Sequence, residues 1–390
     1  MMFPIFLLAL MLGPQSFAND NLLVTPTELV QQSISFNDDL EYKNLLLAIE
    51  RQKAYFARAP LKGKIKFGND TYDRDILGKS LNQLEFMIRK YILCVESMRG
   101  FNLPFGTEKT YCQKEFSKAV NQKFKIYKPQ EDIQRREDIS GPGRALFTAY
   151  YSPDFNGSLT KTETFKNPIY SLPTDPALKK LTRKEIDFQN KLDGKNLELF
   201  YVEESLFDLY LLSVEGGGRV KVGEDYHYIS YAGANGHPFK FLYHYLIDNG
   251  LLPMNQAGLE EQRQYLETNP HQQEAVYSSN PSYIFFKITL DEPMGVGSIP
   301  LTSERSLALD SKIYSQPGLL NFVVSKKPYL DEAGKVRYKN FSRFFLGQDT
   351  GGAIKGRARA DLYMGFGREA QIQANNMKYY GEQYFLVSKE

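Results

Sequence analysis

The sequence predicts a mainly β protein that begins with a helical lobe. Apolar residues recur at three- and four-residue steps in the first third of the chain, and short β-branched and aromatic runs follow after Arg144. Glycine and proline separate these runs, as expected of a barrel. The 390 residues, 42% of them hydrophobic, suffice for one large domain or two with substantial cores.

The helical lobe is predicted from Asp38 to about Phe124. Ser80, with Gln83 three residues later, predicts a capping box at the start of its clearest helix. The apolar face of this helix is made of Leu81, Leu84, Ile88, Tyr91, Ile92 and Val95. We interpret the lobe as a support for the rest of the protein and not as a catalytic centre.

The part after Arg144 is predicted to be built from strands. The β-rich runs cover residues 145–151, 198–202, 226–231, 282–287 and 384–387. Residues 240–249 and 258–268 predict two helices between them.

The chain starts with an apolar run from Met1 to Gly13, followed by small residues at Ser16 and Ala18. This pattern is typical of a signal peptide, here residues 1–18, and is shorter than the roughly 20 residues of a transmembrane helix. No Cys follows the run, so we expect no lipid attachment there and no stable membrane anchor. We expect an exported protein in the periplasm, at the periphery of the outer membrane or in the medium.

Cys94 and Cys112 are the two cysteines of the chain. Their proximity and the oxidising compartment of an exported protein favour a disulfide. Two buried free thiols are an equally weighted alternative.

Composition and missing motifs exclude several function classes. Lys and Arg total 48 against 46 for Asp and Glu, so the chain lacks the basic excess of a nucleic-acid-binding protein. The four histidines form no metal-ligand spacing, and no cofactor motif is present, so we expect neither metal nor cofactor. Asp349-Thr350-Gly351 matches the aspartic protease triplet, but the chain offers one copy where two carboxylates must share a proton.

The segment from Asp349 to Gly365 carries the most chemistry. It places Asp349 and Asp361 around a glycine-rich turn with three cations, Lys355, Arg357 and Arg359. Glycines let a ligand approach the main chain closely, whereas a hairpin with solvated charges is the structural alternative.

Eight motifs occur in an order that resembles the lytic murein transglycosylase A (MltA) family. They extend from Arg144 to the C-terminus. They are Phe147-Thr-Ala-Tyr-Tyr-Ser-Pro153, Asn167-Pro-Ile-Tyr170, Gly216-Gly-Gly-Arg-Val220, Tyr231-Ala-Gly-Ala-Asn-Gly-His-Pro238, Asn280-Pro-Ser-Tyr-Ile-Phe-Phe-Lys287, Ile299-Pro-Leu-Thr302, Ser306-Leu-Ala-Leu-Asp310 and Asp349-Thr-Gly-Gly-Ala-Ile-Lys-Gly356.

The resemblance implies a double-psi β-barrel domain with an inserted second β-domain and a glycan groove between the two. The catalytic domain would comprise residues 19–153, with the helical lobe, together with residues 282–390. The inserted domain would comprise residues 154–281.

The resemblance also implies an enzyme that cleaves peptidoglycan glycan strands without hydrolysis, with Asp361 as the catalytic acid. Asp310 and Asp349 would be the other two aspartates of the site. We expect substrate contacts or positioning roles for Thr148, Tyr150, Asn235 and Lys355.

A lytic transglycosylase needs one group that acts first as acid and then as base, because the C6 hydroxyl of N-acetylmuramic acid is the nucleophile. Two alternatives remain open at this point. One is a hydrolytic glycosidase on a related barrel, with Asp349 or Asp310 as base. The other is a peptidoglycan-binding protein without catalysis.

Overall fold

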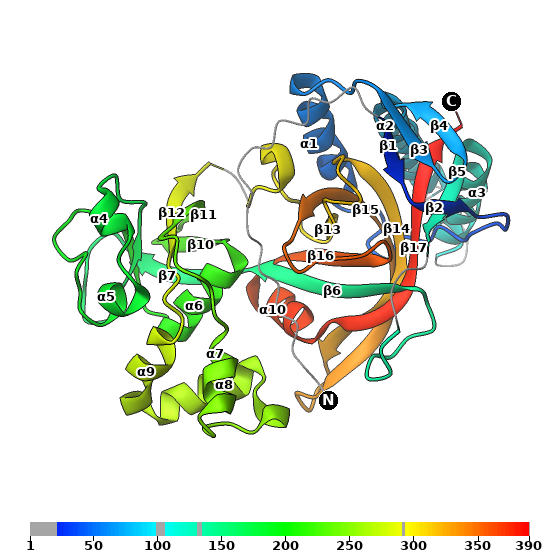
Figure 1. Cartoon of the computed structure of the whole chain (residues 1–390). Coiled ribbons are helices and arrows are strands. Elements are labelled where there is room, and N and C mark those ends of the chain that lie inside the picture. The colour runs from blue at the N-terminus through cyan, green and yellow to red at the C-terminus, as the bar shows by residue number, and fades with distance from the viewer. Residues whose placement is uncertain (1–21, 99–105, 131–134, 291–292, 390) are drawn as a thin grey trace. The chain divides into compact units, whose positions relative to one another are not determined.

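The structure, a computed structural model, describes residues 22–98, 106–130, 135–290 and 293–389, so the expected signal peptide lies outside the described residues. The chain divides into two compact units. The barrel unit contains the described residues up to Tyr151 and from Met294 onward, and the inserted unit is Ser152–Pro293 (Figure 1). Within this described part, no helix has the length and apolar character needed to cross a membrane.

A closed barrel of six strands forms the centre of the barrel unit. The strand order is β14, β15, β13, β16, β6, β17, and β17 pairs again with β14 to close the ring. The strands are β6 (Ala145–Ser152), β13 (Ser306–Leu309), β14 (Leu319–Leu330), β15 (Val336–Thr350), β16 (Arg359–Phe366) and β17 (Lys378–Ser388). The predicted fold class, a mainly β protein with a barrel, an inserted β-domain and an N-terminal helical lobe, is confirmed.

One hydrophobic cluster receives side chains from all six barrel strands and is therefore the barrel interior. Its members include Phe147, Leu309, Val323, Phe345, Leu362 and Phe385. Successive strand residues point to opposite faces, so the residues that alternate with these face outward. On β6 and β16 the outward residues include Thr148, Tyr150 and Asp361.

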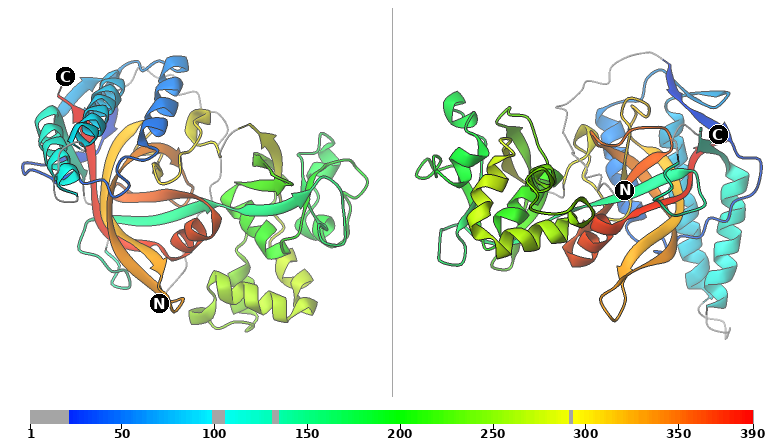
Figure 2. Two further views of the ribbon diagram at one scale, coloured as in Figure 1. Left: turned by 180° about the vertical axis from the view of Figure 1, so that it is seen from behind. Right: turned by 60° about the horizontal axis from the view of Figure 1, so that its bottom comes forward.

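The helical lobe covers part of the outer face of the barrel. It consists of α1 (Leu45–Arg58), α2 (Ile76–Met98) and α3 (Thr107–Lys123). α1 packs against β15, while α2 packs against β17, β14 and α3 (Figure 2). A second hydrophobic cluster joins these helices to outward residues such as Phe322, Phe344 and Leu386.

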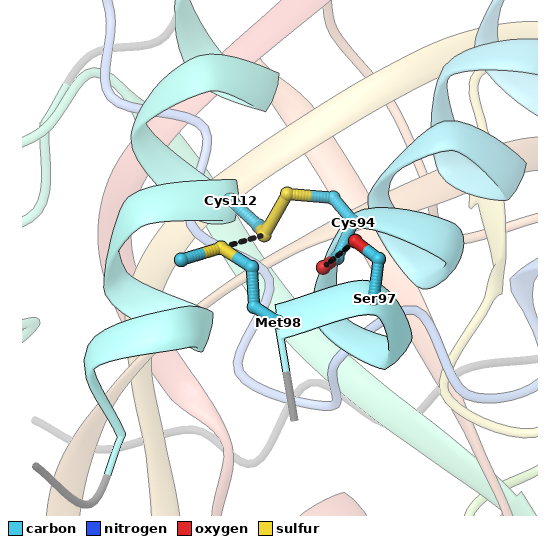
Figure 3. The surroundings of a disulfide bond; sticks show 4 residues. All are labelled: Cys94, Ser97, Met98 and Cys112. Atoms are coloured by element: carbon cyan, nitrogen blue, oxygen red, sulfur yellow. Dashed lines mark hydrogen bonds between the residues drawn. A yellow bond between two sulfur atoms is a disulfide. The ribbon is translucent and has the colours of Figure 1, made fainter. Parts of the chain in front are cut away.

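A disulfide between Cys94 and Cys112 links α2 to α3, so of the two alternatives that the sequence left equally weighted the disulfide is the one present (Figure 3). The sulfur of Met98 lies 3.7 Å from the Cys112 sulfur. The bond ties the two helices together at the ends nearest residues 99–105.

Two local predictions for the lobe are wrong. The helical pattern is interrupted by a hairpin of β3 (Lys64–Phe67) and β4 (Asp70–Asp73), which turns at Gly68 with φ +56°. The capping box is absent because α2 begins four residues earlier than Ser80. The Ser80 hydroxyl donates to the Ile76 carbonyl and accepts from the Ser388 backbone N–H, so it fastens the helix to β17.

Further short elements complete the barrel unit. They are β1 (Leu23–Thr25), β2 (Thr27–Leu29), β5 (Phe124–Pro129), the 3-10 turn η3 (Val296–Ser298) and α10 (Gly367–Asn376). β5 extends the barrel sheet from β17, and β2 pairs with β5.

The inserted unit is a six-stranded sheet with short helices. Its strand order is β12, β11, β10, β7, β9, β8. The strands are β7 (Asp154–Ser158), β8 (Asn167–Tyr170), β9 (Glu198–Val202), β10 (Gly217–Val222), β11 (Asp225–Ala234) and β12 (Ile284–Thr289). The helices are α4 (Pro176–Lys179), α5 (Arg183–Asp187), α6 (Leu206–Glu215), α7 (Leu242–Asp248), α8 (Leu259–Thr268) and α9 (Gln273–Ser278), with 3-10 turns η1 (Met254–Gln256) and η2 (Pro270–Gln272). The two helices predicted at 240–249 and 258–268 are confirmed as α7 and α8.

Candidate active site

Asp349 and Asp361 lie on the two strands that flank β13. Ala308 of β13 is the register partner of Asp349 on β15 and of Asp361 on β16. Directly opposed residues on neighbouring strands project to the same face, so both carboxyl groups lie on the outer face with the Ala308 methyl between them. Two strand spacings separate their backbones by about 10 Å.

A β-bulge brings Asp349 to this position. Leu307 pairs with Gly347, but Ala308 pairs with Asp349, so Gln348 is an extra residue in β15. Bulges of this kind redirect a side chain and are common beside active sites. The Gln348 side chain is held by Ser306, Gln52 and the Ala48 carbonyl, which fixes the bulge against α1.

Asp361 has the environment of a carboxyl group that holds its proton well above the ordinary pKa of an aspartate. Its side chain is 0% exposed, and burial raises its pKa to about 7. Arg359 and the hydrogen bond from Thr148 oppose this rise, whereas the charge of Asp349 adds to it. Thr148 Oγ1 donates to Oδ1, while Oδ2 is buried with no hydrogen-bond partner among the described residues.

Asp349 is held as an acceptor beside this acid. Its Oδ2 accepts from the Tyr150 hydroxyl at 2.6 Å, and its Oδ1 accepts from the Thr350 backbone N–H at 2.8 Å. Burial raises the pKa of Asp349 to about 6, while these two hydrogen bonds lower it. Burial and the Asp349 charge hold the pKa of Tyr150 well above 10, so this phenol remains a donor.

The Asp310 side chain accepts hydrogen bonds from backbone N–H groups. Its Oδ1 accepts from the Lys312 N–H and its Oδ2 from the Gly356 N–H, both at 3.0 Å. Asp310 therefore joins the turn after β13 to the end of the glycine-rich loop, where Gly356 has φ +107°. All five predicted residues Asp310, Asp349, Asp361, Thr148 and Tyr150 thus lie in the barrel unit. Hydrogen bonds join Thr148 to Asp361 and Tyr150 to Asp349.

Lys355 and Asn235 stand apart from these hydrogen bonds. Lys355 is exposed on the glycine-rich loop. Asn235 belongs to the inserted unit, where its amide donates to the Leu181 and Pro281 carbonyls and accepts from the His237 and Tyr283 N–H groups. Its side chain is thus engaged in fixing the turn that follows β11.

Sequence reasoning missed the roles of Arg359 and of the Gln348 bulge. Arg359 counted only as one of three cations, yet it is buried and its Nη2 donates to Thr148 Oγ1 at 2.7 Å. The two-residue spacing between Arg359 and Asp361 on one strand was the available signal, because such residues share a face.

In the described part of the chain, no group of three His, Cys, Asp or Glu side chains could hold a metal ion.

The fold and the site define a barrel protein with two neighbouring carboxyl groups of raised pKa on the outer face of the barrel. Two family models match the chain: the MltA specific insert domain over residues 146–287 and the 3D domain over residues 305–387. The membrane-bound lytic murein transglycosylase A of Escherichia coli K12 is 30% identical over 259 residues, which cover 65% of this chain and 69% of the relative. The chain belongs to the MltA family.

Other relatives agree with this assignment. The membrane-bound lytic murein transglycosylase A of Vibrio cholerae serotype O1 is 32% identical over 252 residues, 63% of this chain and 66% of the relative. The crystal structure of E. coli MltA with bound chitohexaose matches with a TM-score of 0.65 at 22% identity and covers 100% of both chains. MltA of Neisseria gonorrhoeae matches with a TM-score of 0.56 at 25% identity over 80% of this chain and 88% of its own. The family resemblance inferred from the motifs is confirmed.

Proposed function

We propose that the protein is a peptidoglycan lytic transglycosylase with a single catalytic acid/base, Asp361. It would cleave the β-1,4 bond between N-acetylmuramic acid and N-acetylglucosamine and leave a 1,6-anhydro ring on the muramic acid residue. The observation that carries the proposal is the buried Asp361 carboxyl, with its pKa near 7 and a free Oδ2. The names of the relatives, which are murein transglycosylases, and the chitohexaose bound to E. coli MltA support a glycan substrate.

In the first step Asp361 Oδ2–H protonates the glycosidic oxygen, and the bond from this oxygen to C1 breaks. The C6 hydroxyl of the same muramic acid residue then attacks C1, and its proton passes to the Asp361 carboxylate. The carboxyl group is regenerated and no water is consumed, so one group serves both steps. Intramolecular attack supplies the proximity that a second catalytic carboxylate would otherwise have to provide for water. Since Asp361 is fully buried, glycan binding has to uncover Oδ2.

We assign supporting roles to the neighbouring residues. Asp349, ionised above pH 6, keeps the proton on Asp361 and offers negative charge to the oxocarbenium-like transition state. Tyr150 holds Asp349 in place, and Asp310 shapes the loop that presents Lys355 to the polar groups of the glycan. Asn235 supports substrate binding indirectly by fixing its turn.

A hydrolytic glycosidase is the second candidate, favoured by one observation. Asp349 lies on the same face as Asp361, is partly exposed and is ionised near neutral pH. A carboxylate with these properties also suits a base that activates water. Asp310 fits this role less well, because both of its oxygens accept backbone N–H groups.

Product analysis decides between the candidates. Purified sacculi are digested with the protein, and the released muropeptides are analysed by mass spectrometry. We expect 1,6-anhydro ends, whereas hydrolysis would leave reducing ends and a mass larger by one water. An Asp361→Asn variant is digested in parallel to show that the products come from this site.

We also propose that the protein is exported through a signal peptide of residues 1–18 and acts in the periplasm or at the periphery of the outer membrane. The apolar run and the small residues at Ser16 and Ala18 support this. Cell fractionation followed by N-terminal sequencing should find mature protein that starts near Asn19 without detergent. Full-length chain in the membrane fraction would refute this proposal.

A further inference from the structure

We propose that Arg359 is a positioning residue that acts through Thr148 to keep the acid proton of Asp361 on Oδ2. This inference rests on the proposed function, because it says which oxygen of Asp361 carries the proton that the reaction uses. The residues form a chain of hydrogen bonds from Arg359 Nη2 to Thr148 Oγ1 and on to Asp361 Oδ1.

The direction of these hydrogen bonds follows from the groups involved. A guanidinium only donates, so the bond of 2.7 Å from Arg359 uses a lone pair of Thr148 Oγ1. Within the described part of the chain, Asp361 Oδ1 is the acceptor that the Thr148 hydroxyl proton reaches. Once Oδ1 accepts this proton, the proton of the neutral carboxyl group belongs on Oδ2. The reverse arrangement would leave both the Thr148 proton and the Asp361 Oδ2 lone pairs without partners among the described residues, whereas the proposed one leaves only the Oδ2–H proton, which the glycosidic oxygen can accept.

Arg359 is itself fixed by the strands on which the site is built. Its Nη1 donates to the Ala360 carbonyl at 2.6 Å and to the Leu146 carbonyl at 3.4 Å. The side chain is 5% exposed and therefore has little freedom to turn. The guanidinium thus couples β16 to β6 and determines the orientation of the Thr148 hydroxyl.

The charge of Arg359 has a second, separable effect. It lowers the pKa of Asp361 against the larger effect of burial, while Asp349 raises it. Tyr150, from β6, is the other titratable group that faces this pair of carboxyl groups. Lys378 and Tyr380, from β17, are the titratable groups that interact electrostatically with Arg359. Arg359 therefore influences both the position of the proton and the pH at which it is lost.

Two substitutions separate these effects. Arg359→Lys keeps the charge but loses the planar geometry that reaches Thr148 and two carbonyls at once. We expect it to lower the maximal kcat/KM by about 10- to 100-fold, with the alkaline limb of the pH profile unmoved. Arg359→Met removes the charge as well, which raises the pKa of Asp361. Since the acid must be protonated to act, its alkaline limb should move to higher pH.

Arg357→Met is the matched control. It makes the same chemical change two residues away, where the guanidinium donates to Gln130. It should leave the pH profile and the maximal kcat/KM close to those of the wild type. Equal effects of the Met substitutions at positions 357 and 359 would overturn the inference.

A double-mutant cycle keeps the test valid if Arg359→Met folds poorly. Thr148→Val removes the hydroxyl at nearly constant shape, and Thr148→Ser restores it. Arg359→Lys should cost much less activity in the Thr148→Val background than in the wild type, because the bond it breaks is already lost. Additive losses of activity would refute the proposal that Arg359 acts through Thr148. Wild-type products without anhydro ends would instead refute the proposed function, so the two failures are distinguishable.

Discussion

Asp349 and Asp361 face the same side of the barrel from opposite sides of a single strand, separated there by the methyl group of Ala308. Burial raises the pKa of both groups, and the charge of Asp349 adds to the rise at Asp361. Asp361 is fully buried and has a pKa near 7, while Asp349 accepts two hydrogen bonds and has a pKa near 6. Neighbouring carboxyl groups in unlike environments are a common basis for distinct acid and charge-stabilising roles.

The first prediction concerns the acid itself. Asp361→Asn cannot give a proton to the glycosidic oxygen or take one from C6, so the release of anhydro products should fall by at least about 10²–10⁴-fold. Glycan binding should persist and can be measured by co-sedimentation with sacculi. A folded variant with nearly wild-type release would refute the assignment. Asp310→Asn, matched in chemistry, should retain more activity once its thermal stability has been checked.

The second prediction concerns pH. Activity needs Asp361 protonated, so kcat/KM should decline above about pH 7, the pKa of this group. Asp349→Asn removes a negative charge that raises this pKa, so the alkaline limb should move to lower pH. The profile of kcat/KM against pH measures both effects. A limb that moves to higher pH in this variant would contradict the proposed coupling between the two carboxyl groups.

The third prediction concerns stability. The pKa of Asp361 is about 7 in the folded protein against 3.8 as a free group, so folding stability should fall as pH rises between these values. Asp361→Asn lacks this loss and should be the more stable protein at pH 8, by up to about 4 kcal/mol. Denaturant unfolding at pH 5 and pH 8 tests this. A variant that is equally or less stable than the wild type at pH 8 would be inconsistent with burial of an ionisable group.

The fourth prediction concerns the link between α2 and α3. Cys94 and Cys112 are 18 residues apart, and closure of a loop of this size stabilises a fold by about 3 kcal/mol in the chain-entropy model. Reduction should therefore lower the free energy of unfolding by about this amount. Thiol titration of the denatured, unreduced protein should find no free thiol. A Cys94→Ala, Cys112→Ala double variant with unchanged stability in either redox state would contradict the expectation.

The fifth prediction concerns the inserted unit. Asn235→Ala removes an amide that serves four backbone groups, so it should loosen the turn after β11 and raise KM more than it lowers kcat. Steady-state kinetics on soluble glycan fragments measures the two separately. Complete inactivity of a well-folded variant would place part of the chemistry on this residue.

Local patterns predicted much of the fold. The strands at 145–151 and 198–202 and the helix at 258–268 are found close to their expected bounds, because hydrophobic periodicity and turn residues act locally. The motifs of the family identified the barrel and its aspartates. Contacts between distant segments could not be read in this way. Ser80 bonds to Ser388, far away in the sequence, and this contact replaces the cap that its local pattern predicted.

The role of Arg359 and the pairing of Asp349 with Ala308 were hidden for the same reason. A buried arginine near an acid has no distinctive local pattern, and its partner Thr148 is 211 residues away in the sequence. The extra residue in β15 becomes visible only when the register with β13 is known.

The extra residue Gln348 changes which residues of β15 face outward at the end of this strand. Phe341 and Phe345 are odd-numbered residues that point into the barrel, and an uninterrupted strand would send the odd-numbered Asp349 inward with them. The chemistry of the site therefore depends on a count of residues as well as on their identity. If the same sequence ran through this point without the bulge, Gln348 would lie opposite Ala308 on the outer face and Asp349 would point into the barrel.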